Sequence, residues 1–425
     1  MPYLALVQTD MHAREHAFYQ EALTGVRALA AVWVMLFHVN AFAGPRVLSV
    51  YPFGVRIDLH PLLTVGWLGV TLFFVLSGFL LTTHLLDALA RRQERVLPRY
   101  FLARVRRVIP AYWAQLAILF AVALAIQHSP PAWTRYIPLH LAMLHNVSEK
   151  ASYAINSVYW TLPIEFAFYL VLPIIAVRLA RLEMAGAARW KALVLLYAAA
   201  LGVSIAYRYV VFPLGGTNIA WISNQLPGTI DQFVIGTVMA AQWRWWRMSG
   251  AAPAIALRFS NMLLLAGLAG MVAMIYYLDG IHETFWLGHP AVYYWYSINA
   301  LFAGMVVFGA AMGGRVARWL FANRVAVFVG TISYSLYLWH YPIVEWLQAA
   351  NLGFAAFFAV AIPLCIAASA LSYALVERPF LKPHGRAPAS EPHSLRSDAD
   401  VRSEPVIPDA VNSRSSSVNA PDRAG

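Results

Sequence analysis

Charged residues are scarce in this sequence, and their scarcity decides the class of protein. Asp, Glu, Lys and Arg make up 12% of the 425 residues, about half the share that is usual in a soluble globular domain. Hydrophobic residues make up 60%, more than the core of one water-soluble domain can bury. Lipid is the natural solvent for this surplus. The 15 Trp and 21 Tyr agree, because both residues favour the bilayer interface.

Cysteine is almost absent. The one cysteine, Cys365, lies in an apolar run, so the sequence excludes an intramolecular disulfide and a cysteine-based metal site. We expect Cys365 to be a small packing residue, and we predict no metal site in this chain.

Acidic residues are few beside the 31 Lys and Arg, which leaves a net charge of +11. A basic balance can indicate nucleic-acid binding, but the basic residues occur in short clusters between apolar runs, and no nucleic-acid-binding pattern is present. We therefore expect no nucleic-acid partner. Such clusters are typical of the cytoplasmic loops of membrane proteins.

Apolar stretches of about 20 residues recur along the chain, each long enough to cross the hydrocarbon layer as a helix. They predict an all-α fold, a polytopic membrane bundle of about ten transmembrane helices. The predicted spans are residues 23–43, 66–86, 109–127, 157–177, 192–212, 228–243, 260–278, 293–312, 325–348 and 352–376.

The distribution of Lys and Arg predicts the orientation of these spans. If the N-terminus lies inside and the spans alternate, 26 of the 31 basic residues fall on the inner side and 5, among them Arg208, on the outer side. This split predicts that both termini are cytoplasmic. The first span ends in Ala41-Phe42-Ala43, which resembles a signal-peptide cleavage site. A polar segment precedes it, however, and it contains Arg27 and His38, so we expect it to be retained.

Three regions follow from this pattern. Residues 1–22 form a cytoplasmic N-terminal segment, residues 23–380 the transmembrane domain, and residues 381–425 a cytoplasmic tail. The tail is rich in Ser, Asp, Pro and Arg, which predicts disorder.

Three ionisable side chains interrupt the apolar spans near the predicted outer side. Counting from the helix ends at 1.5 Å per residue places His38, Glu165 and His340 roughly 7–12 Å below the outer edge. Ionisable groups inside a membrane are costly, so they mark either function or a buried structural pair. An imidazole beside a carboxylate is what general-base catalysis needs. The alternative is that each group satisfies a local partner and only holds the bundle together.

A cluster of arginines lies at the predicted inner side. Arg27 opens the first span, and Arg104 and Arg107 are three residues apart, which places them on one helix face. Guanidinium groups suit phosphate, although arginines that flank a span need no ligand to explain them. Eleven residues separate Arg27 from His38, or about three full turns, so both point to one side of the helix with about 16 Å between them. This geometry suits a donor with a phosphorylated head and a distant reactive tip, as in an acyl-CoA.

Several motifs resemble those of the acyltransferase 3 family of bacterial membrane proteins. They are LTGVRALAAVWVMLFHV at 23–39 with Arg27 and His38, GVTLFFVLSGFLL at 69–81 with Ser77, RVRR at 104–107, VYWTLPIEFAFYLVLP at 158–173 with Glu165, ISYSLYLWHYPI at 332–343 with Tyr337, His340 and Pro342, and Glu377-Arg378-Pro379. They follow the family's order over nearly the whole membrane domain. The one departure is Thr24, where an Asp is common.

The resemblance implies a transferase of the bacterial inner membrane. Its members move an acyl group, most often acetyl from acetyl-CoA, to sugars such as O-antigen, exopolysaccharide and peptidoglycan, and also to macrolides. We thus expect acetyl-CoA as donor, a glycan or lipid-linked sugar as acceptor, and lipid as surroundings. Some members carry an additional hydrolase-like domain, and nothing after residue 385 predicts one here.

The predicted mechanism gives each candidate a role. Arg27, Arg104 and Arg107 hold the donor phosphates, and His38, with Glu165 nearby, acts as general base or forms an acyl-imidazole. The sequence does not choose between these two routes. A proton-coupled transporter or flippase, with the buried His and Glu as a proton relay, is the rival hypothesis, and a structural scaffold is a third.

Overall fold

The computed structural model describes residues 2–44, 48–184, 189–214, 219–249, 253–285 and 289–381. The chain divides into two units, Met1–Lys382 and Pro383–Gly425. The predicted disordered tail therefore lies, apart from residue 381, outside the described residues. Within them the regular structure is helical, except for a two-stranded antiparallel hairpin of β1 (Ser49–Val50) and β2 (Ile57–Asp58).

Long helices make up the body of the first unit. They are α1 (Pro2–Ala43), α3 (Gly69–Ala90), α4 (Val96–Gln127), α7 (Thr161–Met184), α8 (Arg189–Val211), α10 (Leu226–Ser249), α11 (Pro253–Gly280), α13 (Trp295–Ala311), α16 (Ser333–Gln348) and α17 (Phe354–Ser372). The short helices are α2 (His60–Thr64), α5 (Ile137–Leu141), α6 (Glu149–Ser152), α9 (Ile219–Ser223), α12 (His282–Phe285), α14 (Arg315–Phe321), α15 (Arg324–Thr331) and α18 (Arg378–Leu381).

Tight helical turns connect these elements. The 3₁₀ turns are η1 (Pro52–Gly54), η2 (Gly66–Leu68), η3 (Ala132–Tyr136), η4 (His145–Val147), η5 (Ser157–Trp160), η6 (Phe212–Leu214) and η7 (Pro290–Tyr293), and η8 (Tyr373–Glu377) is a π-helical turn.

A helix lies at each of the ten predicted spans. Among the described residues, seven helices are long and apolar enough to cross a membrane, or eight if α13 and α14, bent by 100° at their junction, form one span. The two remaining ranges correspond to α10, which carries Asp231 and two arginines, and to α15 with α16, which are separate shorter helices. The prediction of a helical, multiply spanning membrane domain is therefore confirmed in kind, whereas the count of ten and the orientation stay predictions.

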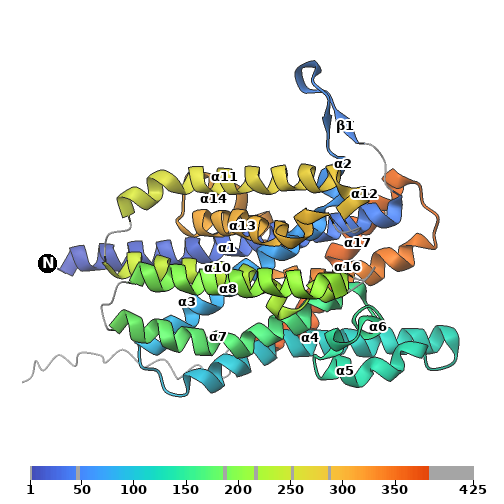
Figure 1. The fold of residues 1–425 in the computed structure, drawn as a ribbon, viewed down its shortest axis with the longest axis horizontal. Helices are drawn as coiled ribbons and strands as arrows, with labels where there is room; N and C mark the ends of the chain where they lie inside the picture. The colour runs from blue at the N-terminus through green and yellow to red at the C-terminus, as the bar shows by residue number, and fades with distance from the viewer. Residues whose placement is uncertain are drawn as a thin grey trace, which may run out of the picture. The chain divides into compact units, whose positions relative to one another are not determined.

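The helices that build the site pack around α1 and α3. Helix α1 contacts α3, α13, α15, α16 and α17, and α3 also packs along α10, which runs beside α8 (Figure 1). Two glycines bring the α3 and α10 backbones together. A Cβ at Gly78 would lie 2.0 Å from the Phe233 carbonyl oxygen, and one at Gly236 would lie 2.1 Å from that of Val75. Small residues permit this approach in membrane helices, and it fixes the helices that line the site.

Candidate active site

Two histidines from distant parts of the chain meet between α1 and α16. Nε2 of His340 lies 3.1 Å from Nδ1 of His38. Each ring also contacts a carbonyl one turn earlier in its own helix: Nδ1 of His340 lies 2.8 Å from the Leu336 oxygen, and Nδ1 of His38 lies 2.9 Å from the Val34 oxygen. His340 is fully buried, while His38 is half-buried and lines a cavity.

These contacts assign the protons of the pair. A carbonyl oxygen can only accept, so Nδ1 of His340 carries the hydrogen that it donates to Leu336, and the Nε2 of a neutral His340 is an acceptor. Nδ1 of His38 then faces two acceptors, the Val34 oxygen and His340 Nε2, and must itself be the donor. In the neutral His38 this leaves Nε2 with a free lone pair. His38 thus has the protonation state of a general base.

His38 borders a cavity of about 390 Å³, which we call the histidine cavity. Its polar lining is made of hydroxyl, amide and imidazole groups, and its aromatic lining is made of tryptophans, tyrosines and two phenylalanines. The residues that line it include His38, Thr64, Trp67, Tyr153, Ser157, Trp160, Asn224, Thr229, Gln232, His282, Trp295, Tyr296 and Tyr337. Among these only His38 and Tyr337 were candidates from sequence. Trp160 lies in a family motif but carries no ionisable group, and the others lie outside the motifs.

A second cavity, of about 100 Å³, lies on the side of Arg27, and we call it the arginine cavity. It is lined by all three candidate arginines, Arg27, Arg104 and Arg107, together with Glu165. The prediction that Arg104 and Arg107 share a helix face is confirmed. Nε of Arg104 is buried without a hydrogen-bond partner among the described residues. A buried cationic donor without a partner is costly, and an anion entering this cavity would satisfy it.

Arg107 contacts η8, near the end of the described chain, and the aromatic ring of a tyrosine in α16. It forms an ion pair with Glu377 at 2.8 Å, and its guanidinium lies 5.6 Å from the ring centre of Tyr334. Glu377 is buried and also accepts a hydrogen bond from Ser335. Even with Glu165 and Glu377 counted, the three arginines leave the cavity with a net positive charge.

Glu165 belongs to the arginine cavity rather than to the histidine pair. Ser77 donates a hydrogen bond of 2.5 Å to its carboxylate, and both residues line the arginine cavity. Arg27 lines the same cavity. The structure therefore brings Ser77 and Glu165 together on the side of the three arginines.

The predicted common depth of the three ionisable groups is wrong for Glu165. Tyr337 bonds to the Val158 oxygen at 2.9 Å and to Thr161 at 3.0 Å. These contacts place Tyr337 of α16 and Thr161 of α7 at about the same level. His340 is one turn from Tyr337 in one direction, and Glu165 is one turn from Thr161 in the other. Glu165 therefore lies roughly 10 Å from the level of His340. Residue counting assumed that this apolar run begins at the membrane surface, whereas it begins beside the middle of α16.

The two cavities share part of their lining. Val70, Phe74 and Tyr337 border both, and we call these three side chains the dividing wall. The prediction that Arg27 and His38 face one side of α1 is confirmed, because each lines one of these neighbouring cavities. Arg27 and His38 therefore border two neighbouring cavities that meet at these three side chains.

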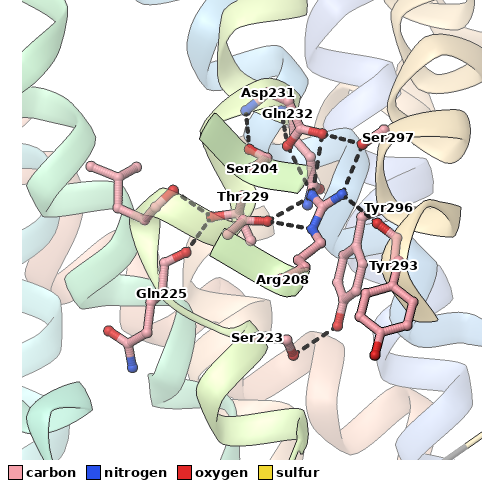
Figure 2. A network of polar contacts seen from close by, with 12 residues as sticks. Ser204, Arg208, Ser223, Gln225, Thr229, Asp231, Gln232, Tyr293, Tyr296 and Ser297 are labelled. Carbon is pink, nitrogen blue, oxygen red and sulfur yellow. Dashed lines mark hydrogen bonds and ion pairs between the residues drawn. The ribbon is translucent and has the colours of Figure 1, made fainter. Parts of the chain in front are cut away.

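A buried ion pair that the sequence reasoning missed supports the histidine cavity. Arg208 of α8 donates to Asp231 of α10 at 3.1 Å, and both side chains are fully buried (Figure 2). The guanidinium also donates to the Gly228 oxygen, to the Tyr293 oxygen and to Ser297, which in turn bonds to Asp231.

This network gives Arg208 a role that the count of outer basic residues did not predict. Arg208 was counted on the outer side because it lies near the outer end of a predicted span, and its guanidinium is turned into the bundle toward Asp231 (Figure 2). Asp231 precedes Gln232, whose side chain lines the histidine cavity. The polar Asp231-Gln232 step inside an apolar span was the signal that could have revealed the pair.

The chain matches one protein-family model. The model, described as an acyltransferase domain, covers residues 20–377, which include every motif residue named above except Arg378 and Pro379. No solved structure matches the chain.

Bacterial transferases are among the curated relatives. A provisionally named O-acetyltransferase of Staphylococcus aureus (strain MSSA476) is 24% identical over 381 residues, 86% of this chain and 58% of that protein. The peptidoglycan O-acetyltransferase OatA of Listeria monocytogenes is 25% identical over 338 residues, 77% of this chain and 49% of that protein. The O-acetyltransferase OatA of S. aureus (strain NCTC 8325) is 25% identical over 383 residues, 86% and 57% respectively. The chain thus spans about half to three-fifths of the length of these relatives.

Proposed function

The chain belongs to the acyltransferase family whose domain model spans residues 20–377, and from this premise we propose that it is a membrane O-acetyltransferase. It moves an acetyl group from acetyl-CoA to a hydroxyl group of a glycan. The observation that carries the proposal is the proton arrangement of His38, whose Nε2 lone pair is free beside a cavity while His340 and a carbonyl hold its other nitrogen.

The arginine cavity supports a phosphorylated donor. Arg27, Arg104 and Arg107 offer guanidinium groups that match phosphate oxygens, and Arg104 Nε is a buried donor in need of an acceptor. The axial separation of Arg27 from His38, about 16 Å, leaves room for an extended arm between a nucleotide phosphate and a thioester. The dividing wall would have to yield for that arm to pass.

The histidine cavity supports a sugar acceptor. Tryptophan and tyrosine rings offer flat apolar faces that suit the C–H faces of a pyranose, and Asn224, Thr229 and Gln232 offer hydrogen bonds to hydroxyl groups. The acetyl group agrees with the names of both OatA relatives, and the glycan class agrees with the name of the L. monocytogenes relative, a peptidoglycan O-acetyltransferase.

The residues of the pair account for the proton transfers. His38 Nε2 accepts the proton of the acceptor hydroxyl as its oxygen bonds to the thioester carbonyl carbon. His340 Nε2 and the Val34 oxygen share the Nδ1 hydrogen and stabilise the imidazolium that forms. His38 then returns the proton to the thiolate that leaves when the C–S bond breaks, which yields free coenzyme A and the acetyl ester. The same lone pair could instead attack the thioester and carry the acetyl group.

Reconstitution tests the proposal. The purified chain in proteoliposomes, with acetyl-CoA labelled in its acetyl group and soluble peptidoglycan fragments, is expected to release coenzyme A thiol and to yield acetylated fragments by mass spectrometry. Movement of fragments across the membrane without acetylation would instead support the transporter hypothesis. Neither product nor movement would leave the scaffold hypothesis.

A further inference from the structure

A proline within α16 frees one backbone carbonyl close to the histidine pair. Pro342 lies inside the helix and has no backbone N–H. The carbonyl of Leu338, four residues earlier, therefore lacks its helical partner. This carbonyl lies between Tyr337, which belongs to the dividing wall, and His340.

Two buried amide side chains take the place of the missing N–H. Nε2 of Gln115, from α4, donates to the Leu338 oxygen at 2.7 Å. Nδ2 of Asn156, from the segment that precedes η5, donates to the same oxygen at 3.0 Å. Both side chains are buried. One carbonyl thus receives two side-chain hydrogen bonds from elements outside its own helix.

Neighbouring contacts fix the direction of both amides. Tyr159 donates to Oε1 of Gln115 at 2.8 Å, and Oδ1 of Asn156 accepts from the Val158 backbone N–H at 3.2 Å. With each oxygen occupied as an acceptor, each NH₂ group is left to face Leu338. The bonding pattern therefore selects one amide orientation at each site.

We propose that Gln115 and Asn156 are positioning residues that hold the proline-containing part of α16, so that His340 stays within hydrogen-bond reach of His38. The inference rests on the proposed function, in which His38 is the base. A helix that lacks one backbone bond can bend at that point, and a bend between Leu338 and Pro342 would move His340. Two amide bonds from separate elements oppose it.

Removing an amide should lower turnover without weakening substrate binding. Gln115→Met keeps the size of the side chain and removes its donor. We expect it to lower kcat on the order of 10- to 100-fold, while KM for acetyl-CoA and for peptidoglycan fragments changes by less than about 2-fold. Asn156→Leu should act in the same direction. Thr237→Val, which removes a buried hydroxyl bonded to Thr82 on helices away from α16, is the matched control and should keep kcat.

A second variant, which restores the missing backbone N–H of α16, provides the decisive comparison. Pro342→Ala returns a backbone N–H that can bond to the Leu338 oxygen. In this background Gln115→Met should lower kcat by a clearly smaller factor than in the native chain. An equal factor in both backgrounds, or an unchanged kcat per folded molecule in Gln115→Met, would overturn the inference.

A spectroscopic readout separates this inference from the proposed function. Nitrogen-15 spectra of labelled histidines report which ring nitrogen of His38 carries hydrogen, with His38→Ala used for assignment. We expect Gln115→Met to change the His38 signals and Thr237→Val to leave them. If His38→Ala retained acetylation, the proposed role of His38 as the base would fail, while a shifted signal in Gln115→Met would still support the positioning role. If the native chain acetylated no acceptor, the proposed function itself would fail. An unshifted signal would overturn that role regardless of activity.

Discussion

Nδ1 of His38 and Nε2 of His340 lie 3.1 Å apart although 302 residues separate them in the sequence. Because Nδ1 of His340 is committed to the Leu336 oxygen, a neutral His340 can only accept from His38. A second imidazole therefore occupies the position in which a carboxylate often orients a catalytic histidine. Unlike a carboxylate, it adds no negative charge to an apolar interior.

Loss of the His38 imidazole should abolish most of the activity. His38→Ala removes the proposed base, and we expect kcat to fall by roughly 10²- to 10⁴-fold, measured as thiol release from acetyl-CoA in proteoliposomes. His84→Ala is the matched control, because His84 makes a similar contact to the carbonyl of Leu80 at 2.7 Å but lies outside both cavities. Full activity of His38→Ala would remove the basis of the mechanism.

His340 should contribute to turnover through Nε2, the atom that accepts the hydrogen bond from His38. His340→Phe keeps a ring but offers no acceptor to His38, so we expect kcat to fall on the order of 10- to 100-fold. His340→Asn offers an amide oxygen and should retain more activity than His340→Phe. The two variants are compared by kcat per folded molecule, and the opposite ranking would contradict the assigned direction of the hydrogen bond.

The arginine cavity should control donor affinity. Arg104→Ala removes a charge-assisted hydrogen bond to phosphate, so KM for acetyl-CoA should rise roughly 10- to 100-fold. Arg106→Ala is the control from the same turn of α4, since Arg106 does not line the cavity. Arg107 is less suitable for this test, because its removal would also leave Glu377 buried without its ion-pair partner. Equal KM values for the two variants would exclude Arg104 from donor binding.

The buried ion pair should affect stability. Arg208→Met leaves the Asp231 carboxylate uncompensated in the interior, and such a change costs about 3–5 kcal/mol. The double variant Arg208→Met with Asp231→Leu removes both charges and should recover part of that loss. Thermal unfolding in detergent measures the difference. A single variant as stable as the native chain would mean that the Asp231 site is hydrated or neutral.

Two histidines outside the spanning helices predict sensitivity to acid. Burial lowers the pKa of His140 to about 3 and that of His145 to about 4, whereas an unfolded histidine titrates near 6.5. The folded state therefore binds fewer protons, so its stability is complete above about pH 6.5 and falls as the pH drops toward 4.

The acid-sensitivity prediction is tested with a substitution that keeps a donor. His145→Gln can still donate to the Tyr159 oxygen, which Nε2 of His145 contacts at 3.0 Å, but it does not titrate. The unfolding temperature of this variant should fall less between about pH 7.5 and about pH 5 than that of the native chain. An identical fall in both proteins would rule out His145 as a source of the acid sensitivity.

The sequence predicted the helical membrane domain and most of the charged site because both leave local signals. Apolar runs reveal spans, and the turn count from Arg27 to His38 places both on one face of α1. The partnership of Gln115 with Leu338, 223 residues away, depends on how helices pack, and no periodicity encodes it. The predicted depth of Glu165 was wrong for a related reason, because only tertiary contacts reveal that η5 starts beside the middle of α16.

The dividing wall of Val70, Phe74 and Tyr337 has a consequence for the permeability of the membrane. A water-filled passage from one face of the bilayer to the other would let protons run down their gradient and drain the energy stored across the membrane. Two apolar side chains and one phenol ring lie where the two cavities meet, and a mostly apolar boundary of this kind resists wetting. If the donor of the proposed reaction enters on the side of Arg27 and the acceptor on the side of His38, this boundary keeps the bilayer electrically tight while both reactants reach the site.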